Sequence, residues 1–218
     1  MNAPSGAFFF PFSNRAPPAP HSGMTAAAIR LKLPQQRVTL KNLKVAEFAS
    51  EETLCFTATV LFDGQAIAYA KNDGQGGQTI VWPCVLGEPI REQIRQAAAY
   101  AESLPPEVTD YPDPNDDSRR LTIDITLDYL VDPLAETMHA ERKIRSAFQR
   151  DIGNKVLFVK DGKLLFVKGA KLKAIADKPA YFASLRARQD KPIVILAELR
   201  ADEAFALWQQ HVVKDDPS

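Results

Sequence analysis

The glycine-rich stretch Asn72-Asp73-Gly74-Gln75-Gly76-Gly77 is the part of the chain whose residue types come closest to a chemical site. Glycine adopts left-handed backbone conformations at little cost, so such a stretch can turn several N–H groups toward one anion. It lacks the lysine and hydroxyl residue of a P-loop, and no helical pattern follows it directly. We favour a bulged turn at the end of a hairpin. The alternative is an anion-binding nest, whose residues would be Asn72, Asp73, Gly74, Gly76 and Gly77.

Cys84 is the candidate nucleophile, and it would need a histidine base that the fold brings close. The histidines are His21, His139 and His211, and no spacing selects any of them. Cysteines more often behave as small buried hydrophobic residues, which accounts for both Cys55 and Cys84. We therefore predict no catalytic residue, no metal site and no cofactor. Whether the chain is an enzyme stays open, with the balance against it.

The charges are unevenly distributed, although 27 Lys and Arg balance 27 Asp and Glu. Residues 101–136 hold ten acids and two bases, whereas residues 141–191 hold fourteen bases and five acids. Aromatic residues interleave the basic segment, so it could offer phosphate contacts and stacking surfaces to single-stranded nucleic acid. The alternative is that the two segments pack together or that the lysines form a solvated rim. The candidate nucleic-acid residues are Lys155, Lys160, Lys163, Lys168, Lys171 and Lys173.

Two hairpins are predicted, each around an Asp-Gly turn between apolar runs. The first spans about residues 53–71 and the second about 155–168. With a regular ladder in the first hairpin, Val60 pairs with Ile67, and Tyr69 lies on a bulky face in the core. The opposite face, rich in Ala and Thr, is smooth enough for a helix or another sheet to approach closely. The second hairpin is apolar on both sides, so it must be covered twice or present one side as an interface.

Helical patterns cover three further regions. Apolar residues recur at helical spacing from Ile90 until Pro105-Pro106 ends the run, and again over 201–212. Residues 112–118 form a polar loop. Residues 121–127 alternate like a strand but also fit a longer helical pattern through Phe148, broken or kinked at Pro133; we choose the helix. The predicted fold class is α+β, with the two antiparallel hairpins packed against three or four helices.

The domain organisation follows from composition. Residues 1–23 are rich in Pro and Phe and are predicted to be a disordered tail, with Met24 as an alternative start. Residues 24–111 would form a hairpin and helix subdomain, and residues 119–213 a second subdomain of helices and a hairpin. No run of roughly 18 apolar residues predicts a membrane span. Two cysteines are too few for a disulfide scaffold, so we expect a cytoplasmic protein.

Four short segments resemble a family of small uncharacterised bacterial and phage proteins. They are Phe48-Ala49-Ser50-Glu51-Glu52-Thr53-Leu54-Cys55-Phe56-Thr57-Ala58, Asn72-Asp73-Gly74-Gln75-Gly76-Gly77, Leu157-Phe158-Val159 and Glu203-Ala204-Phe205-Ala206-Leu207-Trp208. The resemblance covers most of residues 36–210 and implies the hairpins and a phage or mobile-element setting. It carries over no activity, cofactor or catalytic residue.

Three functions are therefore expected, in this order. The first is a non-enzymatic accessory protein of phage or mobile-element type that acts by contact with a protein partner through the second hairpin and the Ala and Thr face of the first. The second is single-stranded nucleic-acid binding by the basic segment 141–191. The third is a small hydrolase or transferase with the glycine turn as an anion cradle. No membrane partner is expected.

Overall fold

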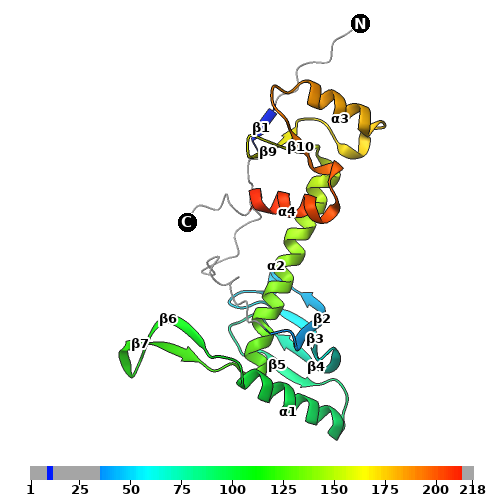
Figure 1. The fold of residues 1–218 in the computed structure, drawn as a ribbon. Helices are drawn as coiled ribbons and strands as arrows, with labels where there is room; N and C mark the ends of the chain where they lie inside the picture. The colour runs from blue at the N-terminus through cyan, green and yellow to red at the C-terminus, as the bar shows by residue number, and fades with distance from the viewer. Residues whose placement is uncertain (1–8, 12–34, 213–218) are drawn as a thin grey trace. The chain divides into compact units, whose positions relative to one another are not determined.

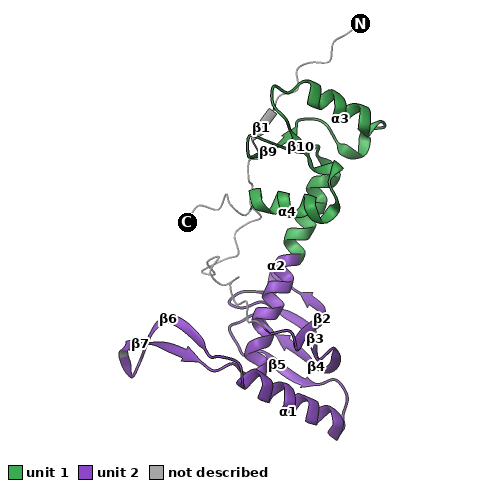
Figure 2. Ribbon diagram, viewed as in Figure 1, with its two compact units in different colours: residues 1–19, 142–218 green, residues 20–141 purple. Residues whose placement is uncertain are grey.

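The chain folds into two compact units joined by one long helix. The computed structural model describes residues 9–11 and 35–212. Unit 1 comprises residues 1–19 and 142–218, and unit 2 comprises residues 20–141 (Figure 2). Helix α2 (Leu127–Asn154) contributes residues to both, with the division after Glu141. The fold is α+β with antiparallel strand pairs, so the predicted fold class is confirmed (Figure 1).

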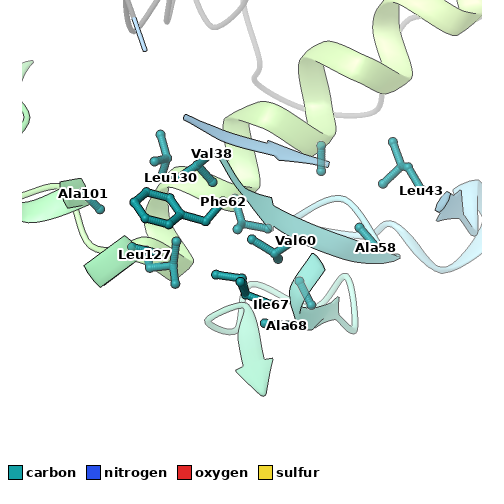
Figure 3. Packing of buried hydrophobic residues seen from close by; sticks show 14 of the residues in the cluster. Val38, Leu43, Ala58, Val60, Phe62, Ile67, Ala68, Ala101, Leu127 and Leu130 are labelled. Atoms are coloured by element: carbon teal, nitrogen blue, oxygen red, sulfur yellow. The ribbon is translucent and has the colours of Figure 1, made fainter. Parts of the chain in front are cut away.

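Unit 2 is built on a four-stranded sheet with its helices on one face. Its strands β2 (Val38–Val45), β3 (Phe56–Phe62), β4 (Gln65–Asn72) and β5 (Ile80–Pro83) lie in that order. Helix α1 (Glu88–Glu102) has a proline in its first turn, where the missing N–H costs nothing. Side chains of α1 and α2 pack with the inner face of the sheet, as Figure 3 shows for Ala101, Leu130 and Val60.

The first hairpin has the predicted Asp-Gly turn but not the predicted faces. Asp63 and Gly64 both have positive φ, at 49° and 81°. A register shift after Val60 pairs it with Ala68 rather than with Ile67, because the ladder contains a bulge. One additional residue on β4 moves every later side chain to the opposite face. Ala68 and Ala70 are therefore in the core, and Tyr69 points outward.

Two predictions are wrong: the polar loop over residues 112–118, and the helix that includes residues 121–127. Strands β6 (Glu107–Asp113) and β7 (Asp116–Ile123) form a further hairpin, in unit 2, and α2 begins at Leu127. Residues four apart satisfy the strand period and the helix period together, so Ile123 and Leu127 fitted both patterns. The alternation at Leu121 and Ile123 was the strand signal. Helix α2 then continues past Pro133.

Unit 1 contains the remaining hairpin, β8 (Leu157–Lys160) and β9 (Lys163–Val167), with β10 (Val194–Ile195) beside β8. Of the two expectations for this doubly apolar hairpin, coverage on both faces is correct. Phe158 packs with residues of α3 (Lys178–Ala187), and Leu157 packs with residues of α2 and α4 (Ala201–Val212). The second hairpin therefore offers no open apolar face, and its proposed use as a contact surface is wrong.

Within segment 1–23, Phe9–Pro11 forms strand β1, which pairs with β9 in an antiparallel register. The other residues of that segment, and Met24, lie outside the described residues. No helix among residues 9–11 and 35–212 is long and apolar enough to cross a membrane.

Candidate nucleic-acid interface

The glycine stretch forms a turn organised by the buried side chain of Asn72. Its Oδ1 accepts hydrogen bonds from the Gly74 N–H at 2.8 Å and from the Thr53 hydroxyl at 2.9 Å. Its Nδ2 donates to the Thr79 hydroxyl and to the Gly77 carbonyl, both at 3.0 Å. Asn72 is only 2% exposed, and these four bonds satisfy its amide group.

Gly74 is needed for the close approach between this turn and the Ala49 backbone, and Gly76 has a positive φ of 77° that favours glycine. A Cβ on Gly74 would lie 2.1 Å from the Ala49 carbonyl oxygen, and one on Gly76 would lie 2.1 Å from the Glu52 carboxylate. The Gly76 N–H donates to the Thr53 hydroxyl at 3.3 Å. An anion would therefore compete with protein acceptors for the N–H groups of Gly74 and Gly76. The anion-binding set, in which the exposed Asp73 carboxylate forms an ion pair with Lys71 at 2.6 Å, stays a prediction.

A polar chain continues from this turn to α2. Thr79 is 3% exposed and donates its hydroxyl hydrogen to the Asp132 carboxylate. Gln78 donates to Asp128, one helical turn earlier, at 2.6 Å. Burial raises the pKa of Asp132, which the hydrogen bond from Thr79 offsets in part. The glycine turn is thus attached to the helix, which is a structural role.

The candidate cysteine has no catalytic arrangement around it in the described part of the chain. The Cys84 thiol lies 3.4 Å from the Ala66 carbonyl oxygen, and both cysteines are partly exposed. His139 lies 3.2 Å from the Glu47 carboxylate. Among residues 9–11 and 35–212, no group of three or more His, Cys, Asp and Glu side chains could hold a metal ion.

The candidate lysines of unit 1 differ in their exposure. Lys155 and Lys160 are half-buried; Lys155 contacts Asp151 at 2.8 Å, and Lys160 contacts Asp190. The other four candidates are exposed: Lys163, Lys168, Lys171 and Lys173. Most of the interleaved aromatic residues are unavailable for stacking, because Phe158 and Phe182 are in the core and Phe166 and Tyr181 pack against it. This segment therefore has exposed lysines but no exposed aromatic ring on which a base could stack.

The outer face of the unit 2 sheet has exposed aromatic residues, whereas no aromatic residue among residues 142–212 of unit 1 is exposed. Cross-strand pairing places two rows of side chains across all four strands. We call these eight residues the open sheet face: Lys41, Thr59, Tyr69 and Trp82 in one row, and Lys44, Thr57, Lys71 and Ile80 in the other. None is buried, whereas Leu61 on the same side near the hairpin turn is 3% exposed.

Tyr69 and Trp82 form an exposed aromatic pair on this face. Their ring centroids are 6.0 Å apart, with an angle of 52° between the ring planes. Tyr69 is 44% exposed and Trp82 is 40% exposed, and the neighbouring Ile80 is 60% exposed. Large aromatic side chains are usually mostly buried, so an exposed cross-strand pair indicates a surface that something else covers.

The open sheet face is basic within an acidic unit. Residues 35–141 contain eighteen Asp and Glu against eight Lys and Arg, yet three of the eight residues on this face are lysines and none is acidic. The hydrogen bond and charge of Asp73 raise the pKa of Lys71, so this lysine stays protonated at neutral pH. The face therefore combines aromatic rings, hydroxyl groups and positive charge.

Sequence reasoning missed this face because it assumed an unbroken ladder. Tyr69 and Lys71 are two residues apart on one strand, so they share a face, and a lysine is a poor core residue. The two-residue spacing of Tyr69 and Lys71 was therefore the signal in the sequence that Tyr69 lies outside the core. The remaining part, the position of Trp82 opposite Tyr69, required the pairing of β5 with β4.

The comparisons with known proteins add no function. The chain matches no protein-family model, no curated protein and no solved structure. The resemblance to small bacterial and phage proteins stays a prediction from the residues quoted for it.

Proposed function

We propose that this protein binds single-stranded nucleic acid on the open sheet face. One observation carries the proposal: Tyr69 and Trp82 form an exposed ring pair beside three lysines, on the side of the sheet opposite its helices. Unpaired bases stack on such rings because every base has an aromatic face, and lysines neutralise the phosphates between them. Thr57 and Thr59 add hydroxyl groups that hydrogen-bond to phosphate or sugar.

The surroundings of the face favour a single strand over a duplex. Bases in a duplex are already stacked on one another, so exposed rings give them nothing to gain. The acidic remainder of unit 2 repels phosphates, which confines a strand to the one basic surface. Binding by stacking and phosphate contacts tolerates many base sequences.

Unit 1 contributes to the same function in a different way. Lys163, Lys171 and Lys173 are exposed in a unit whose residues 142–212 carry fifteen Lys and Arg against seven Asp and Glu. No aromatic ring among residues 142–212 is exposed, so these lysines would add salt-sensitive phosphate contacts that are indifferent to the bases. The alternatives with a protein partner or an enzymatic activity stay predictions, ranked behind nucleic-acid binding.

The test is titration of a labelled single-stranded oligonucleotide at low salt, followed by fluorescence anisotropy. Tyr69→Ala and Trp82→Ala should each weaken binding roughly tenfold, since stacking contributes about 1–3 kcal/mol per base. Tyr111→Ala is the matched control, because Tyr111 is also an exposed aromatic residue of unit 2, at 72% exposure, but lies outside the face. Equal affinity for all three variants and the natural chain, or no binding at all, would contradict the proposal.

An intrinsic signal provides a second measurement. The chain has two tryptophans, the exposed Trp82 and the buried Trp208, which is 2% exposed. Stacking of a base on Trp82 should quench its emission, while Trp208 remains as a constant background. The quench should persist in a Trp208→Phe variant and vanish in a Trp82→Phe variant. The opposite assignment would place the bound strand away from the open sheet face.

A further inference from the structure

The β6–β7 hairpin, which we call the ribbon, has no core of its own. No described side chain between residues 107 and 124 is buried, whereas the other sheet of unit 2 contributes most of a hydrophobic core. Figure 1 shows the ribbon leaving the rest of unit 2. Val108 is 64% exposed and Tyr111 is 72% exposed. A lone two-stranded hairpin is marginally stable in water, so this one gains stability from whatever covers it.

The ribbon nevertheless has a defined shape at both ends. At its tip, Asp113 accepts a hydrogen bond from the Asn115 N–H at 2.8 Å, and Asp116 accepts one from the Ser118 N–H at 3.0 Å. At its base, the Tyr129 hydroxyl on α2 donates to the Glu107 carboxylate. These contacts fix a preformed arm, which lowers the entropy cost of docking.

The ribbon is acidic, and the chain contains its electrostatic complement. Residues 107–123 hold five acids and two arginines, while residues 142–212 carry a net charge of plus eight. The whole chain is nevertheless neutral, with 27 charges of each sign. The acidic ribbon of one copy can therefore neutralise the basic unit 1 of another copy. If each copy contributes both surfaces, the arrangement closes into a two-fold dimer.

We propose that the ribbon docks on the basic surface of unit 1 in a second copy of this chain. The exposed lysines of residues 163–178 face the ribbon's acids, and Val108 and Tyr111 supply apolar contact within the charged rim. The exposed edges of β6 and β7 offer backbone groups to the same partner. This interaction leaves the open sheet face free. It uses the unit 1 lysines to which the proposed function also gives phosphate contacts, so the ribbon and a nucleic acid would compete for them.

Sedimentation velocity of the full chain over a range of concentration and salt tests the proposal. A dimer should form at low ionic strength and dissociate as salt screens the charges. The variant Asp110→Asn with Asp117→Asn should weaken dimerisation roughly tenfold, because it removes two of the five acids of residues 107–123. It keeps Asp113 and Asp116, which hold the tip. The control with Glu102→Gln and Asp124→Asn removes the same charge from unit 2 outside the ribbon and should leave dimerisation unchanged.

A charge exchange distinguishes a second copy from any other occupant. Lys171→Glu with Lys173→Glu should abolish the dimer, and adding Asp110→Lys with Asp117→Lys to the same chain should restore it. A chain that stays monomeric at low salt overturns the proposal. A dimer whose dissociation constant is unchanged by both sets of substitutions also overturns it. Association only when an oligonucleotide is added would assign the basic surface to nucleic acid instead. The two Asn substitutions should leave stacking on Trp82 unchanged, so failure here and failure of nucleic-acid binding are separate results.

Discussion

The two units distribute aromatic and charged residues in opposite ways. Unit 1 is basic but keeps Phe158, Phe182 and Trp208 in its cores, whereas unit 2 is acidic but exposes Tyr69 and Trp82 on a face with three lysines. A segment's composition therefore does not say which side chains meet the solvent. The residues that can bind a ligand by stacking lie in the unit whose overall charge argues against a polyanion.

The largest expected effect tests whether the aromatic residues of unit 1 are structural. Phe158→Ala should destabilise unit 1 by about 3–5 kcal/mol, because it removes a ring that is 0% exposed. Tyr69→Ala in unit 2 should change stability by less than about 0.5 kcal/mol. Thermal unfolding monitored by Trp208 reports on unit 1, and Trp82 reports on unit 2. Comparable losses of stability in the two variants would contradict the contrast between the units.

The second effect compares one glycine from each unit. Gly74→Ala should destabilise unit 2 by roughly 3 kcal/mol, since it combines a positive φ of 84° with a contact of 2.1 Å to the Ala49 carbonyl. Gly162→Ala in unit 1 has a φ of 70° but meets no atom within 4 Å, so only the backbone strain of about 1 kcal/mol applies. Denaturant titration of both variants measures the difference. Equal destabilisation would show that the tight packing around Gly74 is unimportant.

The pH dependence of stability should have opposite signs in the two units. Burial raises the pKa of Asp132 and of Glu136 in unit 2, so the folded state holds protons that the unfolded state releases. These groups therefore reduce stability as pH rises from the ordinary carboxyl pKa through the raised values. In unit 1, the hydrogen bond from Lys160 lowers the pKa of Asp190, which adds stability that disappears as pH falls through the lowered value.

Unfolding followed at Trp82 from about pH 3 to pH 8 measures how the stability of unit 2 depends on pH. Asp132→Asn should flatten the fall in unit 2 stability as pH rises, and Asp190→Asn should leave unit 2 unchanged. A curve for unit 2 that does not respond to Asp132→Asn would show that burial of this carboxyl group has no energetic consequence.

The smallest effect concerns salt. Replacing Lys163, Lys171 and Lys173 with Ala should reduce the slope of log affinity against log salt by about 0.7 for each phosphate that is no longer neutralised. The Trp82 quench at saturation should not change, because no aromatic ring among residues 142–212 is exposed. A change in the quench without a change in slope would reverse the roles assigned to the two units.

Local signals in the sequence determined several elements. The turns at Asp63-Gly64 and Asp161-Gly162 place both residues at positive φ, which Asp and Gly tolerate better than most residues do. Pro89 lies in the first turn of α1, and the helix ends at Glu102 ahead of Pro105-Pro106. The uneven charge distribution was also visible, because it needs no knowledge of contacts. These features depend on neighbouring residues alone.

The tertiary structure decided which side chains are exposed. A bulge at Ile67 reversed the faces of β4, and only the pairing with β5 placed Trp82 beside Tyr69. Likewise, nothing within residues 155–168 says that both faces of that hairpin are covered by helices that lie outside this segment. Burial depends on which segments meet, and a one-residue change in register reverses every face, so local patterns cannot fix either one.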